Sequence, residues 1–237
     1  MVESFGERLA VRIKERGPLC VGIDPSSEQL RAWGRGDDIT GLEFFMLQML
    51  EASSGVAAAI KPQVAFFERF GSRGFAALER LIRDAASADV LIVGDAKRGD
   101  IGSTNDGYAD AWLADGSPLA VDALTVTPYL GLTAMNSLFA QAESTGRGVF
   151  VVVASSNDEG RPVQTARTHS GESVEDFHFE LIARRNESSE SPIGSIGAVV
   201  GATRQTTRFA LEQMRGPFLV PGVGAQGATP SDVGRLF

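Results

Sequence analysis

Four charged residues occupy positions at which they could act together on one anionic substrate. Asp95 and Lys97 lie two residues apart, Asp100 follows three residues later, and Lys61 closes an earlier apolar run. If Asp95 and Lys97 belong to one strand, side-chain alternation turns both to the same side. Two of only three lysines in the chain thus end apolar runs, where a surface charge has little reason to be.

The chemistry that suits such an array is the loss of a carboxylate group. A lysine held between carboxylates keeps its proton, so it is a poor Schiff-base nucleophile and a good fixed acid. Asp95 would repel a substrate carboxylate, and this repulsion disappears when the group leaves as neutral CO2. Lys97 could then stabilise and protonate the carbanion without any metal. The structural alternative is a salt-bridge network, because buried charges must be paired.

The elements that must position these residues follow from the apolar pattern. Seven short runs rich in Val, Ile and Ala are continuous rather than alternating, which is typical of strands buried on both faces of a parallel sheet. They are Leu19–Asp24, Val56–Lys61, Val90–Lys97, Ala120–Thr127, Val149–Ser155, Ile196–Gly201 and Phe218–Val223. Helix-like stretches separate most of them, and alternating β and α units imply right-handed crossovers.

Seven such units predict an α/β fold, a (β/α)8 TIM barrel formed by residues 1–237 as one domain, with a helix over Ser4–Arg16 at its base. The competing doubly wound sheet would carry a Gly-rich turn after its first strand, where this chain has Asp24-Pro-Ser-Ser. Residues 157–194 form the longest connection, a helix flanked by polar loops.

Helical periodicity predicts several of the connecting helices. Thr40 and Glu43 fit a capping box that opens a helix ending near Ser53. Apolar residues recur at helical spacing in the other segments. These are Gly74–Ala88, Leu132–Ser144, Ser173–Asn186 and Thr206–Met214.

Polar side chains gather where the predicted strands end, and in barrels that end carries the active site. The candidate set is Asp24, Lys61, Asp95, Lys97, Thr127, Ser155, Ser156, Asn157, Thr203 and Gln226.

Composition excludes several other classes of protein. A net charge of -8 argues against nucleic acid or an anionic membrane as the main partner. The single cysteine, Cys20, rules out an internal disulfide, and no apolar run approaches a membrane span. The two histidines, His169 and His178, lie in a polar stretch and are expected at the surface. With an N-terminus unlike a signal peptide, these features predict a cytoplasmic protein.

Several of these motifs together resemble the orotidine 5'-monophosphate decarboxylases. Lys61 in Ala-Ile-Lys-Pro-Gln and Asp24 in Gly-Ile-Asp-Pro match the family residues after the second and first strands, and Pro221-Gly-Val-Gly-Ala-Gln-Gly matches its phosphate-side loop. The family signature at the third strand is matched by Asp95, Lys97, Asp100, Ile101 and Thr104.

The resemblance implies conversion of orotidine 5'-monophosphate (OMP) to UMP and CO2 in pyrimidine biosynthesis, without metal or organic cofactor. It implies that Lys97 donates the proton to C6 and that Asp95 lies against the substrate carboxylate. Lys61 and Asp24 would hold ribose hydroxyls and the charge network.

The resemblance also implies a homodimer with shared sites, in which Asp100, Ile101 and Thr104 enter the site of the other subunit. Ser156 would read the pyrimidine amide, with Ser155 and Asn157 as alternatives in the same turn. Gln226 would contact the phosphate.

One departure from the family concerns the C-terminal part. No eighth apolar run follows Gln226, and the family's phosphate-binding arginine after the eighth strand has no counterpart. Arg235 falls on the expected seventh helix and is not assigned that role. We expect an eighth unit beyond the sequence shown; the alternative is a form that is not competent.

Three rival functions stay open at this point. A keto-sugar-phosphate decarboxylase or hexulose-phosphate synthase of the same superfamily would use Mg²⁺ and an acidic ligand immediately before Asp95, where this chain has Gly94. An aldolase would use Lys61 as a Schiff base. A non-catalytic phosphate-ligand-binding protein is the alternative outside the enzymes.

Overall fold

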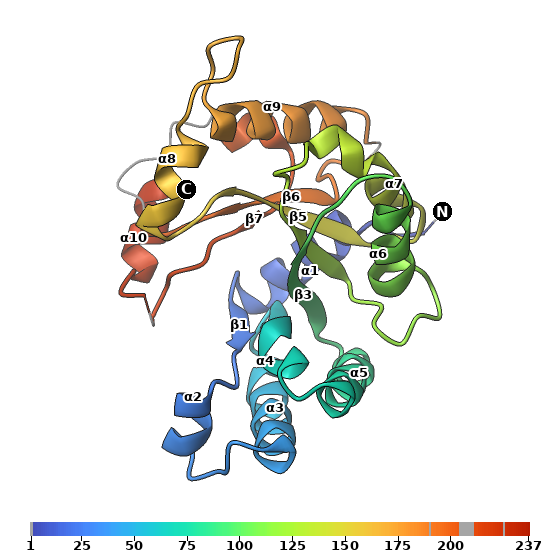
Figure 1. The fold of residues 1–237 in the computed structure, drawn as a ribbon, viewed down its shortest axis with the longest axis vertical. Coiled ribbons are helices and arrows are strands. Elements are labelled where there is room, and N and C mark those ends of the chain that lie inside the picture. Colours follow the sequence, from blue (N-terminus) through green and yellow to red (C-terminus); the bar gives the residue numbers. More distant parts are fainter. Residues whose placement is uncertain (1, 190, 204–210, 225) are drawn as a thin grey trace.

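The computed structural model describes residues 2–189, 191–203, 211–224 and 226–237. Seven parallel strands form one curled sheet in the order of the sequence, with helices on its outer side (Figure 1). The strands are β1 (Cys20–Ile23), β2 (Ala59–Pro62), β3 (Leu91–Arg98), β4 (Ala123–Val126), β5 (Gly148–Ala154), β6 (Ile196–Val200) and β7 (Phe218–Leu219). Each lies within or across one predicted apolar run, so the (β/α)8-type fold is confirmed, with seven units present.

Most predicted helices are confirmed with small shifts in their ends. The segment Leu132–Ser144 divides into a 3-10 turn and a helix, and Ser103–Leu113 is helical although no periodicity had singled it out. The helices are α1 (Phe5–Arg16), α2 (Ser27–Ala32), α3 (Ile39–Ser53), α4 (Val64–Glu68), α5 (Ser72–Ser87), α6 (Ser103–Leu113), α7 (Asn136–Ser144), α8 (Arg161–Gln164), α9 (Val174–Glu187) and α10 (Pro230–Leu236). Short 3-10 turns are η1 (Leu132–Met135), η2 (Asp158–Gly160) and η3 (Leu211–Met214).

The capping box predicted at Thr40 is wrong. Helix α3 begins two residues earlier, and its N-cap is Asp38, whose Oδ1 accepts the Gly41 N–H at 2.9 Å. An aspartate is as good a cap as a threonine, so the first suitable side chain takes the position. Most of the predicted helix Thr206–Met214 lies outside the described residues, and its last four residues form η3.

The surface position predicted for His178 is also wrong. His178 is only 8% exposed and shares the buried face of α9 with Phe179 and Ile182, at helical spacing. Burial disfavours the charged imidazole and lowers the pKa of His178. His169 is exposed, as predicted.

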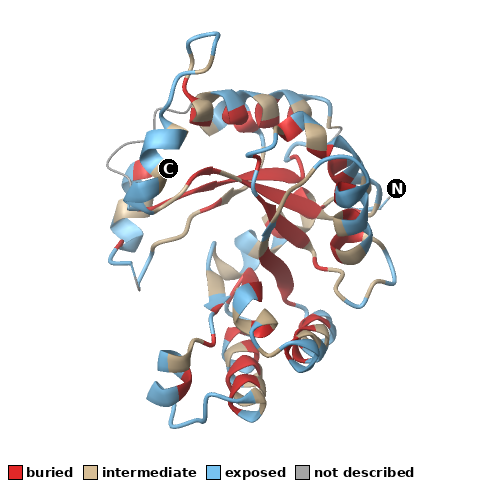
Figure 2. Cartoon of the chain, in the orientation of Figure 1, coloured by how far each residue is buried: buried red, intermediate tan, exposed pale blue. Residues whose placement is uncertain are grey.

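Two apolar clusters lie on the two faces of the sheet. The larger one packs the outer face of the strands against the helices, and the strands are buried along most of their length (Figure 2). The smaller one fills the barrel interior from its N-terminal end. There Phe5 of α1 is fully buried and meets Phe150 of β5 edge-to-face, with ring centroids 5.8 Å apart. The helix predicted at the base is therefore confirmed, and it plugs the N-terminal end of the barrel.

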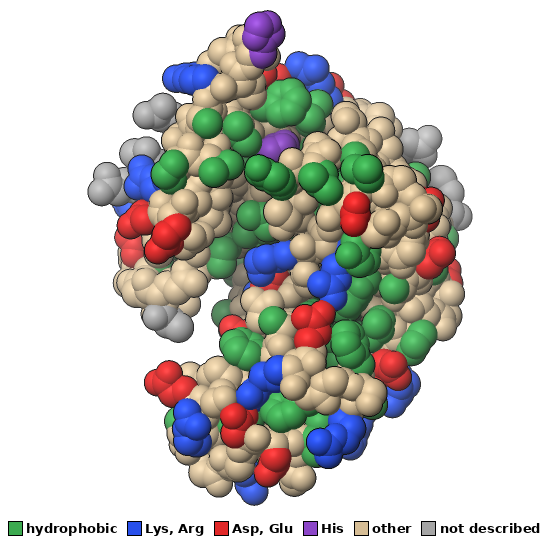
Figure 3. Space-filling view, viewed as in Figure 1, with side chains coloured by type: hydrophobic (Ala, Val, Ile, Leu, Met, Phe, Trp, Pro, Cys, Tyr) green, Lys and Arg blue, Asp and Glu red, His purple; other side chains and the backbone are tan. Residues whose placement is uncertain are grey.

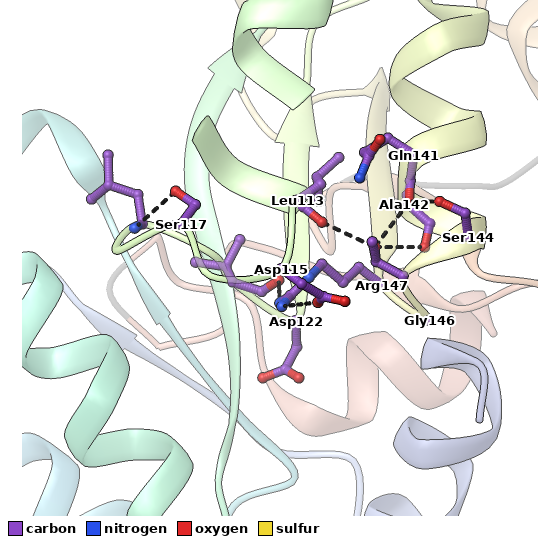
Figure 4. A network of polar contacts seen from close by, with 12 residues as sticks. Leu113, Asp115, Ser117, Asp122, Gln141, Ala142, Ser144, Gly146 and Arg147 are labelled. Carbon is purple, nitrogen blue, oxygen red and sulfur yellow. Dashed lines mark hydrogen bonds and ion pairs between the residues drawn. The ribbon is translucent and has the colours of Figure 1, made fainter. Parts of the chain in front are cut away.

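Charged side chains connect neighbouring elements at this N-terminal end through hydrogen bonds and ion pairs. Arg147, just before β5, donates to the carbonyl of Val121 at 2.7 Å (Figure 4). Asp122, just before β4, accepts from Arg8 of α1 and from the backbone N–H of Ile92. A structural salt-bridge network of the kind considered from the sequence therefore exists, at the end of the barrel away from Lys61 and Lys97.

The two ends of the curled sheet do not meet. Within the described residues β1 pairs only with β2 and β7 only with β6. The space-filling view shows the molecule hollowed on one side (Figure 3). In the described part of the chain, no helix combines the length and apolar character needed to cross a membrane.

Candidate active site

Strand alternation brings charged residues to the upper end of the barrel interior. On β3, Leu91 and Val93 belong to the interior cluster, and Asp95 is the next residue on that side. On β2, Ala59 lies in the same cluster and Lys61 follows two residues later. The apolar interior thus ends in a layer of charge at the C-terminal ends of neighbouring strands.

Asp95 is the centre of this layer. It is 7% exposed, and each of its carboxylate oxygens contacts the ammonium group of a lysine. Lys61 Nζ lies 2.8 Å from Oδ2, and Lys97 Nζ lies 2.5 Å from Oδ1. Gln63 Nε2 donates to Oδ2 at 3.2 Å and the Thr125 hydroxyl to Oδ1 at 2.9 Å. Each oxygen therefore has two donors, which satisfies a buried carboxylate.

Lys97 reaches Asp95 from an irregular part of β3. The pairing of β3 with β4 jumps from Gly94 to Arg98, and Lys97 has a φ of 49°, in the left-handed region. A non-glycine residue adopts this conformation only where its surroundings hold it, and such residues cluster at functional sites. The Lys97 side chain is 48% exposed, so its ammonium group touches both Asp95 and the open mouth of the barrel.

The charges shift one another's protonation. Burial would raise the pKa of Asp95, but the attraction and hydrogen bonds of Lys61 and Lys97 outweigh it, and the pKa is lowered. Burial would lower the pKa of Lys61, yet Asp95 and Asp24 outweigh that effect and raise it. Lys61 is therefore held as a cation, and this argues against the aldolase alternative, which needs a neutral amine.

Asp24 joins the group as a more distant member. Its carboxylate lies over Gly22, with Oδ2 3.5 Å from the place of a Cβ there, and it attracts Lys61 without direct contact. The side chain is open to solvent at its tip, but surrounding protein atoms reduce its hydration. This loss of hydration is the main reason why the pKa of Asp24 is raised, with Lys61 opposing it.

Sequence reasoning missed two members of this site. Thr125 is 1% exposed in the middle of β4, and Gln63 follows the end of β2. A lone polar residue inside an otherwise apolar strand was an available signal for Thr125. Gln63 carried no such signal, because its partner Asp95 lies on another strand.

The signature residues after β3 do not all join the charge cluster. Asp100 forms no ion pair with Lys61 or Lys97 of its own chain within the described residues; its carboxylate accepts the Ile101 N–H at 2.8 Å. The sequence predicted that Asp100 joins the other three charges. Within a single chain this part of the prediction is wrong. Buried Asn105 holds this loop by accepting the Asp100 N–H at 2.9 Å.

Ile101 and Thr104 are both exposed to solvent. Ile101 is 60% exposed, and Thr104 is exposed in the first turn of α6. Tyr129 and Leu130, which follow the neighbouring strand β4, are 82% and 52% exposed. Large apolar side chains thus stand in solvent beside the charged mouth.

The three candidate residues in the turn after β5 differ in their hydrogen bonds. The Ser155 hydroxyl accepts from Gln164 Nε2 at 2.7 Å, and Asn157 is bound to Glu159 at 2.9 Å. The Ser156 hydroxyl has no hydrogen bond within the described residues. Ser156 is held instead through its carbonyl, which accepts from Thr203 Oγ1 at 2.7 Å.

Glycines bring the turn of Ser156 close to the seventh unit. A Cβ at Gly201 would lie 2.5 Å from Ser156 Cα, so only glycine permits this contact. Gly222 has a φ of 107°, and its place for a Cβ lies 3.2 Å from Thr203 and 3.3 Å from Gln226 Oε1. Ser156, Thr203 and Gln226 thus lie close together, in the segments that follow β5, β6 and β7.

Metal ligation has little support among these residues. The described residues contain no cluster of three or more His, Cys, Asp or Glu side chains placed for a metal ion. The residue type at position 94 does not separate the rival enzymes. A side chain there would face Val121 and Trp112, on the opposite side of the sheet from Asp95. The stronger argument is that both oxygens of Asp95 already contact ammonium groups, which repel a cation.

Comparisons with known proteins identify relatives of this chain. A model of the orotidine 5'-phosphate decarboxylase / HUMPS family matches residues 17–236. A curated orotidine 5'-phosphate decarboxylase from Salinispora tropica is 50% identical over 236 residues, covering 100% of this chain and 84% of that protein. Another from a Nocardioides species is 50% identical over 236 residues, covering 98% and 86%.

Solved structures show the same relationship. A crystal structure described as that of an orotidine 5'-phosphate decarboxylase from Streptomyces avermitilis superposes with a TM-score of 0.92 at 48% identity, covering 100% of this chain and 83% of that one. The Leishmania donovani OMP decarboxylase gives a TM-score of 0.71 at 33% identity, covering 93% and 80%. The chain therefore belongs to the orotidine 5'-phosphate decarboxylase / HUMPS family.

Proposed function

We propose that this chain decarboxylates OMP to UMP and CO2, as the names of its curated relatives state for those proteins. The observation that carries the proposal is the buried Asp95 carboxylate between two ammonium groups, one of which is half-exposed at the barrel mouth. This arrangement places a fixed negative charge and a fixed proton donor side by side. A substrate that loses a carboxylate and then gains a proton at the same carbon uses both.

The reaction follows from these charges. The substrate carboxylate at C6 lies beside Asp95, and their repulsion raises the energy of the bound ground state. The C6–carboxyl bond breaks, CO2 leaves without charge, and the electron pair stays on C6. The Lys97 ammonium group stabilises this carbanion because its contact with Asp95 fixes its position before the charge develops. Lys97 Nζ then transfers a proton to C6, and solvent returns the proton to the amine.

The remaining residues hold the substrate. Lys61 and Asp24 would hold the ribose hydroxyls, which their position in and beside the charged layer supports. Ser156, whose hydroxyl has no hydrogen bond within the described residues, reads the pyrimidine amide, and Gln226 contacts the phosphate beside the glycines of the seventh unit. Binding energy from the phosphate end would help to hold the ring against Asp95.

The direct test is an OMP decarboxylation assay in EDTA, followed by the loss of orotate absorbance. We expect the wild-type protein to be active and Lys97→Ala to lower kcat by about 100-fold or more, in the range of general acid catalysis. Lys14→Ala is the matched control, because Lys14 is an exposed lysine on α1. Full turnover by Lys97→Ala would remove Lys97 from its role. Activity lost in EDTA and restored by Mg²⁺ would favour the keto-sugar-phosphate enzymes instead.

The proposal includes a homodimer with shared sites. Its support is that the Asp100 carboxylate pairs with neither Lys61 nor Lys97 of its own chain within the described residues, and that Ile101 and Tyr129 are exposed. In a symmetric dimer these residues would cover the partner's site. Mixed Lys97→Ala and Asp100→Ala chains should recover about a quarter of wild-type activity, because half of randomly assorted dimers are hybrids with one intact site. No recovery in verified hybrids would refute shared sites.

A cytoplasmic location also belongs to this proposal, on the ground of the single cysteine. Fractionation of the source cells tests it, and recovery of the protein with a membrane or secreted fraction would contradict it.

A further inference from the structure

Thr125 occupies a position between the two groups that perform the proposed chemistry. Its hydroxyl oxygen accepts the backbone N–H of Lys97 at 3.0 Å, and its hydroxyl proton goes to Asp95 Oδ1 at 2.9 Å. Lys97 Nζ contacts the same Oδ1 at 2.5 Å. One hydroxyl on β4 therefore holds the backbone of the proton donor and the carboxylate beside it.

The irregular pairing of β3 and β4 explains why a side chain is needed here. Between Gly94 and Arg98 the ladder skips residues, so the N–H of Lys97 has no carbonyl partner on β4. The φ of Lys97, 49°, is a conformation that an L residue keeps only under restraint. The Thr125 hydroxyl takes the place of the missing carbonyl, and its 1% exposure keeps water from competing.

We propose that Thr125 is a positioning residue, whose hydroxyl holds Lys97 in its left-handed conformation and fixes Lys97 Nζ against Asp95. This inference rests on the proposed decarboxylation. Thr125 itself does not touch the reacting atoms, since its hydroxyl is already used twice within the protein. The hydroxyl alone carries the positioning role.

The test compares Thr125→Val, which keeps the shape of the side chain and removes the hydroxyl, with Thr125→Ser, which keeps the hydroxyl. For Thr125→Val we expect kcat to fall about 10- to 100-fold with KM for OMP changed less than about threefold, because a small displacement of a catalytic group costs rate rather than binding. Thr125→Ser should retain kcat within about threefold. Thr145→Val is the control, because the Thr145 hydroxyl is also bound to backbone but lies far from the mouth.

A second readout separates positioning from a merely structural role. Removal of one donor from the ionised Asp95 should move the acid limb of the kcat profile to higher pH in Thr125→Val and leave it in place in Thr125→Ser. The groups that face Asp95 are Cys20 and Asp24 on the β1 side, Lys61 and Gln63 on the β2 side, Lys97 on β3 and Thr125 on β4. All except Thr125 are unchanged in these variants.

Each outcome decides the matter. Wild-type kcat in a folded Thr125→Val, or an equal loss of kcat in Thr125→Ser, would overturn the positioning role. If Thr125→Val fails to fold, Thr125→Ser still tests the inference, because a large loss of kcat in this variant, which keeps the hydroxyl, would overturn it. If the wild-type protein does not turn over OMP, the proposed function falls. The inference is then tested by a crystal structure of Thr125→Val: it stands if the φ of Lys97 becomes negative or Nζ leaves Asp95, and falls if neither moves.

Discussion

Replacing Lys61 by methionine is the perturbation with the best-defined consequence. The Lys61 side chain is 14% exposed and the side chain of its partner Asp95 is 9% exposed, with 2.8 Å between the charged atoms. Removing one member of a buried ion pair typically costs about 3–5 kcal/mol, because the other charge stays buried. Asp95 keeps Lys97, Gln63 and Thr125 as donors, so we expect the lower end, about 3 kcal/mol. In a chain of this size that lowers Tm by roughly 6–12 °C.

The loss should depend on pH in a defined direction. In the wild-type protein the pKa of Asp95 is lowered, so its stabilising contribution is present above the unfolded pKa of about 3.9 and is lost as pH falls through the folded value. Without Lys61 the pKa of Asp95 should rise above 3.9, since burial then prevails. The penalty of the variant is therefore full at pH 8 and shrinks as pH falls through that raised value.

The assay is urea unfolding of Lys61→Met at pH 8 and pH 5, with exposed Lys14→Met as the control. A double-mutant cycle with Asp95→Asn isolates the pair, because the two changes should be less than additive. The reasoning is refuted if Lys61→Met costs no more than Lys14→Met, or if its cost is the same at both pH values.

Three further predictions concern single contacts. Asp38→Ala removes the N-cap of α3 and should cost about 1 kcal/mol in urea unfolding, whereas Thr40→Ala, at the discarded cap, should change stability by less than half of that. Phe5→Ala should cost about 3–5 kcal/mol by opening a cavity at the barrel base, and unchanged stability would contradict the plug. Gln164→Leu removes two hydrogen bonds, one from the Ser155 N–H and one to the Ser155 hydroxyl. At about 1 kcal/mol each, their loss should lower the free energy of unfolding by about 2 kcal/mol in urea, and it should raise KM for OMP in steady-state kinetics because the turn that contains Ser156 is released.

The strand pattern was predictable because it depends on spacing along the chain. Seven buried runs determined the parallel sheet, and alternation along β3 placed Asp95 on the same side as Leu91 and Val93. The helix at the base was predicted together with the barrel. Predictions that depended on choosing between neighbouring residues were weaker: the N-cap at Asp38 and the buried His178 were both misjudged, since several local solutions have similar free energy.

The site residues also divide into those predictable from local spacing and those that depend on distant contacts. The residue types and order of Asp95, Lys97 and Lys61 already pointed to a fixed proton donor beside a carboxylate, because two-residue spacing and strand ends need no knowledge of distant contacts. The left-handed backbone of Lys97 and its hydroxyl partner on β4 depend on the register between strands far apart in sequence. The hydrogen bonds of Ser155 to Gln164 and of Asn157 to Glu159 depend on how the loop after β5 folds. Register and side-chain competition are set only when the strands pack together, and for that reason the tertiary structure alone decided them.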